Sequence, residues 1–168
     1  MTADFEHHKL RPFQQKVVAA RESGDLFQLG STLSENAEQS AQLGRDLLAE
    51  GDYERGPDAL RNAIALFDES IKVASQSEDW ESQAFGLWQS GTVLWDLGHF
   101  EEGVSRLEHS RDLFNLHDDD RSAIVTQTLA QWDESSKPAE RKADEDDNWS
   151  LHHTFGLLRE LVRQPQAE

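Results

Sequence analysis

The sequence predicts an all-α protein in which antiparallel helix pairs repeat along the chain. Three observations predict this class. Hydrophobic residues recur at three- and four-residue steps over most of the 168 residues, and no segment shows the alternation or the tight turns of β-hairpins. Single glycines separate the periodic segments. Finally, one stretch of the chain resembles another when the sequence is shifted by 47 residues.

The N-terminal half of the chain contains the first three predicted helices. Pro12 suits the first turn of an opening helix that ends at Gly24. A second helix spans residues 26–50, and Gly51 is placed to end it in the left-handed conformation. The third helix continues to about Ser75, with its apolar residues on one side.

Three more helices follow in the next part of the chain. Asp79 is a good N-cap for a fourth helix, which ends near Gly98. The fifth helix covers residues 100–115, and the aspartates at 118–120 precede a sixth helix that runs through Trp132. Residues 1–133 therefore form the predicted helical domain.

The C-terminal part of the chain has a different composition. Residues 134–147 contain Pro138, a run of four acidic residues and no apolar residue larger than Ala, so they are predicted to be an acidic flexible linker. Residues 148–163 form a predicted amphipathic helix that must dock on the domain to remove its apolar stripe from water. Two docking places remain open: the end of the stack, as a cap, or a groove on its surface.

The internal repeat is the most informative feature of the sequence. At a shift of 47 residues, glycines coincide with glycines, and an aromatic residue coincides with another. Beyond this segment the best shift falls to 40, which predicts a seven-residue insertion, two helical turns, in the third helix. The matched pairs are Gly44 with Gly91, Gly51 with Gly98, and Tyr53 with Phe100.

Each repeated position has a physical reason. Gly44 and Gly91 lie in the middle of helices, where glycine costs about 1 kcal/mol relative to Ala, so a neighbouring helix is expected to cross closely there. The two later glycines allow the left-handed conformation that ends one helix and starts its antiparallel partner. Tyr53 and Phe100 are predicted to fill the gap between the paired helices.

This spacing resembles the consensus of tetratricopeptide repeats, with degenerate units at about 37–76 and 80–115. The resemblance implies a right-handed stack, completed by flanking helices, that binds other proteins on its concave face. It places nine residues on that face: Glu38, Ala41, Arg45 and Leu48 in the first unit, and Phe85, Trp88, Thr92, Trp95 and Asp96 in the second. A core position beneath a flanking helix is the alternative for Trp88 and Trp95.

The charge of the chain limits its partners. Sixteen basic and 33 acidic residues give a net charge of −17, which repels phosphate backbones and anionic lipids, so neither nucleic acid nor membrane is an expected partner. The acidity serves either solubility or the attraction of a basic partner. No apolar run approaches the ~20 residues that span a bilayer, and the N-terminus lacks the pattern of a signal peptide. These features predict a cytoplasmic protein.

The sequence carries no motif for catalysis. The chain has no Cys, which excludes disulfides, thiol catalysis and thiolate zinc sites. Its adjacent His pairs lack the spacing of metal ligands, and it has neither a phosphate-binding glycine loop nor a nucleophile elbow. We therefore expect no enzyme, no cofactor and no metal. The expected function is a protein- or peptide-binding adaptor; a homo-oligomeric assembly module, such as a homodimer, is the alternative, and an enzyme or small-ligand sensor is less favoured.

Overall fold

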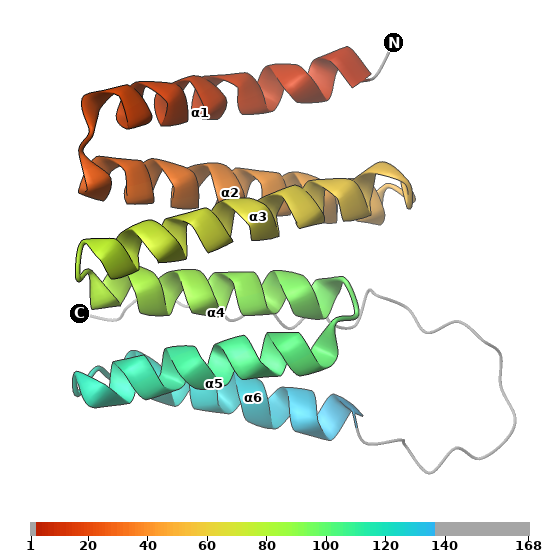
Figure 1. The fold of residues 1–168 in the computed structure, drawn as a ribbon. Helices are drawn as coiled ribbons and strands as arrows, with labels where there is room; N and C mark the ends of the chain where they lie inside the picture. The colour runs from red at the N-terminus through yellow and green to blue at the C-terminus, as the bar shows by residue number, and fades with distance from the viewer. Residues whose placement is uncertain (1–2, 137–168) are drawn as a thin grey trace, which may run out of the picture. The chain divides into compact units, whose positions relative to one another are not determined.

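Six helices form the part of the chain that the structure describes. A computed structural model describes the backbone of residues 3–136 and the side chains of residues 10–133. The helices are stacked in chain order, and successive helices run antiparallel (Figure 1). Their bounds are α1 Ala3–Ser23, α2 Leu26–Ala49, α3 Arg55–Gln76, α4 Trp80–Asp96, α5 Phe100–Leu116 and α6 Arg121–Ser136.

The predicted all-α class of helix-pair repeats is confirmed by this stack. The arrangement also fits the tetratricopeptide-like pairing that the sequence suggests. Residues 134–136, predicted to begin the linker, belong to α6, while the rest of the predicted linker, from position 137, and the whole predicted helix at 148–163 lie outside the described residues. None of the helices of residues 3–136 combines the length and the apolar character needed to cross a membrane.

The core consists of three hydrophobic clusters between helices that follow one another in the chain. Each cluster is built from residues three, four or seven apart, so helical periodicity produces it directly. The first cluster joins α2, α3 and α4, the second joins α4, α5 and α6, and the third joins α1, α2 and α3. Their largest fully buried side chains include Phe67 of the first cluster, Phe114 of the second and Leu33 of the third.

Local hydrogen bonds set the predicted helix ends. Gly51 and Gly98 have φ of +85° and +81°, and the residue after each donates its N–H to a carbonyl five residues earlier, at 2.8 and 2.9 Å. Asp25 and Asp79 accept the N–H groups of Gln28 and Ser82, each at 3.0 Å, and so cap α2 and α4. The predicted stops at Gly51 and Gly98 and the predicted cap at Asp79 are confirmed.

Pro12 does not have its predicted position. It lies well inside α1, because the helix already begins at Ala3. The prediction relied on the preference of proline for a first helical turn, where its missing N–H costs nothing. In the interior of α1 this residue instead removes one backbone hydrogen bond.

Two glycine pairs bring the paired helices into close contact. A Cβ atom on Gly44 would lie 2.7 Å from the Leu60 side chain and 2.9 Å from the carbonyl oxygen of Gly56. A Cβ atom on Gly91 would lie 2.3 Å from Leu107 and again 2.9 Å from a glycine oxygen, that of Gly103. No side chain fits at these separations, so the predicted close crossing is confirmed in both units.

The repeat register differs from the prediction in the third helix. The shift of 47 residues continues through α3 and α5, where glycine faces glycine and equally buried residues correspond, so the predicted insertion inside α3 is wrong. The extra residues lie at the opposite end of the pair, where α2 has 24 residues and α3 has 22, against 17 in both α4 and α5. Seven residues are two turns, so both registers place apolar residues on the same face and the sequence could not distinguish them. The corresponding residues are Gly56 and Gly103, Leu60 and Leu107, and Phe67 and Phe114.

Tyr53 and Phe100 do not fill a gap between the paired helices. Tyr53 is 69% exposed and Phe100 is 47% exposed, although the Phe100 ring contacts Trp95 edge-on with centroids 4.7 Å apart. The glycine pairs explain the difference, because helices that cross so closely leave no gap to be filled.

Candidate binding groove

A groove of about 430 Å³ lies on the face that α2 and α4 share. We call it the α2–α4 groove. Its walls come from the N-terminal halves of α2 and α4, with one residue from α3 and the first residue of α6. The lining residues are Phe27, Gly30, Ser31, Ser34, Glu35, Glu38, Ser70, Glu81, Ser82, Phe85 and Arg121.

The repeat explains why these residues face the same groove. The α2 residues Ser34, Glu35 and Glu38 line one wall, and the residues 47 positions later in the chain line the other. These are Glu81, Ser82 and Phe85 of α4. Equivalent positions of two repeat units point to one side because the units share a backbone register. The groove is therefore the common face of the first helices of the two units.

Two phenylalanines give the groove an apolar component. Phe27, in the first turn of α2, is 70% exposed, and Phe85 of α4 is half-buried. The buried Gly30 and Ser70 lie at the base, where the Ser70 hydroxyl donates to the Gly30 carbonyl oxygen at 3.0 Å. An exposed aromatic ring beside a hollow is a typical feature of a protein-binding surface.

Three carboxylates lie in the walls, and they differ in their partners. Lys16 of α1 donates to both oxygens of Glu35, at 3.1 and 3.0 Å. Arg121 of α6 donates to Glu81 Oε1 at 2.8 Å. Glu38 has no hydrogen bond or ion pair to any described side chain. Partial burial raises the pKa of Glu38, and the nearby negative charge of Glu35 raises it further.

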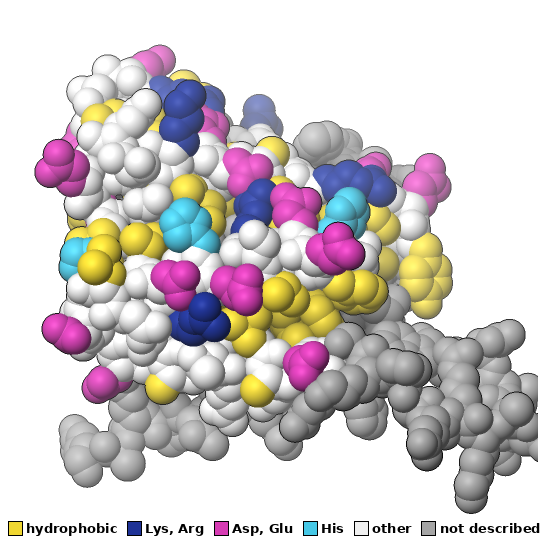
Figure 2. Space-filling model, turned by 60° about the horizontal axis from the view of Figure 1, so that its bottom comes forward, with side chains coloured by type: hydrophobic (Ala, Val, Ile, Leu, Met, Phe, Trp, Pro, Cys, Tyr) yellow, Lys and Arg dark blue, Asp and Glu magenta, His cyan; other side chains and the backbone are white. Residues whose placement is uncertain are grey.

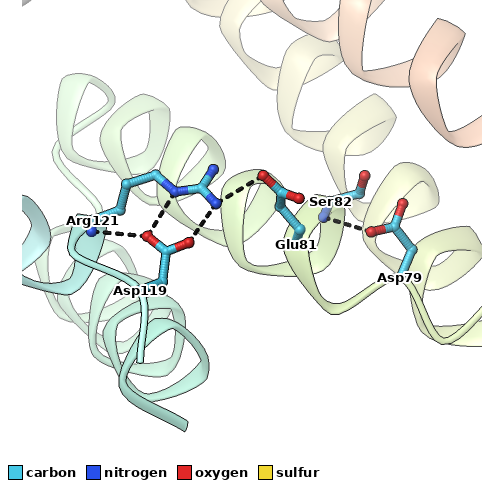
Figure 3. Close-up of polar contacts among 5 residues, drawn as sticks. All are labelled: Asp79, Glu81, Ser82, Asp119 and Arg121. Carbon is cyan, nitrogen blue, oxygen red and sulfur yellow. Dashed lines mark hydrogen bonds and ion pairs between the residues drawn. The ribbon is translucent and has the colours of Figure 1, made fainter. Parts of the chain in front are cut away.

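Arg121 is fixed at the edge of the groove by a second carboxylate (Figure 3). Its Nε and Nη2 donate to the two oxygens of Asp119 at 2.9 and 2.6 Å, and its guanidinium lies 4.8 Å from the centre of the Phe114 ring. These hydrogen bonds from Arg121 lower the pKa of Asp119 to about 2. Arg121 therefore ties the start of α6 to the start of α4 through Glu81.

Two residues predicted to contact a partner instead pair with each other. Arg45 Nε of α2 donates to Asp96 Oδ2 of α4 at 2.8 Å, and the Asp96 side chain is 2% exposed. Burial raises the pKa of Asp96, while Arg45 acts in the opposite direction. The pair connects the two repeat units, so both side chains bind each other rather than a partner.

Five other predicted residues are buried or partly buried against the hydrophobic clusters. Ala41 and Thr92 are buried, and Leu48 packs against the first hydrophobic cluster. Trp88 and Trp95 pack against the second cluster, where the Trp95 ring stacks on Trp132 of α6 at 4.1 Å. This packing favours the alternative interpretation of both tryptophans as core, because Trp88 contacts Phe114 of α5 and Trp95 contacts Trp132 of α6.

Only Phe85 and Glu38 of the predicted face line the groove, and the remaining lining residues were missed. Phe27 carried a usable signal, because it stands outside the apolar stripe of Leu29, Leu33 and Ala37 on the same predicted helix. A large aromatic residue off the core face suggests an exposed contact. Arg121 carried no such signal, because only the fold brings α6 beside Glu81.

One face of the described part of the chain carries many acidic side chains. Asp and Glu side chains are spread over the face in Figure 2, around an exposed hydrophobic patch. Among the side chains that the structure describes, no group of three His, Asp or Glu residues is arranged to hold a metal ion. The α2–α4 groove combines a hollow with charged and aromatic side chains, and it is our candidate site.

A known protein shares part of the sequence. Over 64 residues the chain is 44% identical to the mitochondrial import receptor subunit TOM20 homolog B of Danio rerio. The matched stretch covers 35% of this chain and 44% of the relative, so the chain spans less than half of the relative's length. No model of a known protein family matches the chain, and no solved structure matches it.

The predicted cytoplasmic location is wrong in view of this relative, which is a mitochondrial protein. The prediction rested on composition and on the absence of long apolar runs. Neither property identifies the compartment in which a protein resides.

Proposed function

We propose that the chain is a non-catalytic adaptor that holds a peptide segment of another protein in the α2–α4 groove. The observation that carries this proposal is the position of Phe27, which is 70% exposed beside a hollow with acidic walls. Aromatic side chains of this kind supply much of the binding energy at protein interfaces. An exposed ring offers no comparable benefit to folding.

The chemistry of the groove indicates the type of segment. Apolar side chains would pack on Phe27 and Phe85, and at least one cationic side chain would meet the carboxylates of the walls. The net charge of −17 would also attract a basic partner over a distance and accelerate its approach. The proposed ligand is therefore an apolar and basic peptide segment.

Two further observations support a receptor role of this kind. The first helices of both repeat units line the groove, as expected for the concave face of a tetratricopeptide-like array, and we assign the stack to that type. The relative from Danio rerio is named as a subunit of a mitochondrial import receptor. By analogy we place the binding activity of this chain at the mitochondrion.

Fluorescence anisotropy with a labelled peptide of Leu and Lys residues, added to the full chain, tests the proposal. Phe27→Ala should weaken binding about tenfold, because a hot-spot aromatic contributes over ~1 kcal/mol. Tyr53→Ala is the matched control, since its ring is 69% exposed and lies outside the groove. Equal effects of the two substitutions, or no effect of Phe27→Ala, would overturn the proposal.

A further inference from the structure

The three carboxylates of the groove are not equivalent. Glu35 and Glu81 each receive a cation from a flanking helix, Lys16 at 3.0 Å and Arg121 at 2.8 Å. Glu38 lies at the position of α2 that matches Phe85 of α4, and no described cation reaches it. The groove thus contains two neutralised carboxylates and one with an unsatisfied charge.

We infer that Glu38 is the residue that selects a cationic side chain in the bound peptide, at one fixed position of the groove. This inference rests on the proposed function. It goes beyond a general preference for basic partners, because it assigns the charge recognition to a single residue of α2.

The three carboxylates differ in what a ligand cation would have to displace. At Glu81 it would compete with Arg121, which two further bonds to Asp119 hold in place. At Glu35 it would compete with Lys16. At Glu38 there is nothing to displace, so the new ion pair would form without breaking an existing one.

The surroundings of Glu38 further favour the binding of a ligand cation to its carboxylate. Partial burial and the charge of Glu35 both disfavour the ionised form of Glu38, as the raised pKa shows. An arriving ammonium or guanidinium group would offset both effects. Glu38 still keeps enough exposed surface for a peptide cation to reach its carboxylate from solvent.

The fold also sets a spacing. Phe27 and Glu38 are 11 residues apart on α2. At a rise of ~1.5 Å per residue, they lie roughly 16 Å apart along the helix axis. A helical ligand running along α2 would therefore carry its apolar anchor and its cation about three turns apart.

A series of labelled peptides tests the inference. The members carry Leu on one face and differ only at one position, which is Lys, Gln or Glu, set three turns from the first Leu. Glu38→Gln in the full chain should weaken the Lys peptide about fivefold and leave the Gln peptide unchanged. Glu108→Gln is the matched control, because Glu108 is exposed on α5 and does not line the groove, and it should change the affinity for the Lys peptide less than about twofold.

A second measurement separates recognition from a structural role. Because Glu38 makes no bond within the described chain, Glu38→Gln should fold normally and raise the Tm slightly at pH 7. Its folded pKa is raised, so the ionised carboxylate opposes folding at pH 7, and this penalty disappears as the pH falls through that pKa. The gain in Tm should therefore vanish in acid. A lower Tm for Glu38→Gln at pH 7 would contradict this account.

The two proposals fail in different ways. If Glu38→Gln distinguishes the Lys and Gln peptides as well as the wild type does, while Phe27→Ala still weakens all peptides, the inference about Glu38 is wrong and the groove remains the binding site. If Phe27→Ala has no effect on any peptide, the proposed function itself is wrong.

Discussion

The α2–α3 pair and the α4–α5 pair have the same packing, but they differ in helix length at one end. Both copies have the same glycine crossing and the same left-handed turn, 47 residues apart. The first copy is longer by five to seven residues per helix, away from that turn. This extension carries Phe27, Gly30 and Ser31 of α2 and Ser70 of α3, which all line the groove.

The comparison separates two kinds of position. Positions with the same small or apolar residue in both units set how the helices pack. Positions that face the groove differ between the units, as Glu38 differs from Phe85. The residues that the two units share therefore align their helices, and the residues that differ between the units form the binding surface.

The largest expected effect comes from breaking the shared crossing. Gly91→Val should destabilise the domain by about 3 kcal/mol or more, because the added bulk meets Leu107 and the Gly103 carbonyl with no room to shift. Urea unfolding followed by circular dichroism measures the loss. Ala65→Val, at an exposed helical position, is the control for valine itself. Equal stability of the two variants would exclude the close crossing.

The connection between the two units should be the next most sensitive feature. Arg45→Met leaves the buried Asp96 carboxylate without its partner and should cost about 3 kcal/mol at pH 7. The loss should shrink as the pH falls, because Asp96 with its raised pKa takes up a proton more readily in the folded state. Urea unfolding at several pH values measures both effects.

Arg61→Met is the matched control for Arg45→Met. Arg61 pairs with Asp58 at the surface, where both side chains are well exposed. Its loss should therefore cost less than about 0.5 kcal/mol at every pH. A similar cost for both variants would mean that burial gives the Arg45–Asp96 pair no special role.

Tyr53 and Phe100 occupy equivalent positions in the two units, so substituting each of them compares the two units directly. Phe100→Ala should cost about 1 kcal/mol, because it removes the edge contact with Trp95, whereas Tyr53→Ala should cost less than about 0.5 kcal/mol. Thermal unfolding of the two variants side by side measures the difference. A larger loss for Tyr53→Ala would contradict the exposed position of that ring.

The smallest expected effect concerns the turns that follow α3 and α5. Asp119 has a pKa of about 2 against its usual 3.8, so it stabilises the fold above pH ~4 and loses this contribution as the pH falls through ~2. The stability difference between the wild type and Asp119→Asn should accordingly narrow between these pH values. Asp79→Asn, at the matching turn, controls for changing an aspartate near a helix start. A constant difference down to pH 2 would contradict the pairing with Arg121.

Local features of the sequence predicted most of the fold. The helix stops at Gly51 and Gly98 and the cap at Asp79 depend on a few neighbouring residues, so they can be read without the fold. The glycine crossing was also predictable, since glycine in a helix needs a compensating contact. The candidate site was predictable only in part, through Phe85 and Glu38.

The rest of the site could not be predicted, because it depends on which helices pack against one another in the fold. Arg45 and Asp96 are 51 residues apart in sequence, and only the packing of α2 on α4 reveals that they pair. Trp95 similarly becomes a core residue because α6 packs against it through Trp132. The position of the groove depends on the register of the longer first unit. The sequence did not reveal this register, because a shift of two helical turns leaves the hydrophobic pattern unchanged.

The stacking of each helix on its neighbours in the chain has a consequence for how the protein forms. Contacts between sequence neighbours close only short loops, and proteins dominated by such contacts fold fast. In an array of this kind, folding can start in one helix pair and spread to the next. A nascent chain leaving the ribosome could therefore build most of the α2–α3 core before α5 and α6 have been synthesised.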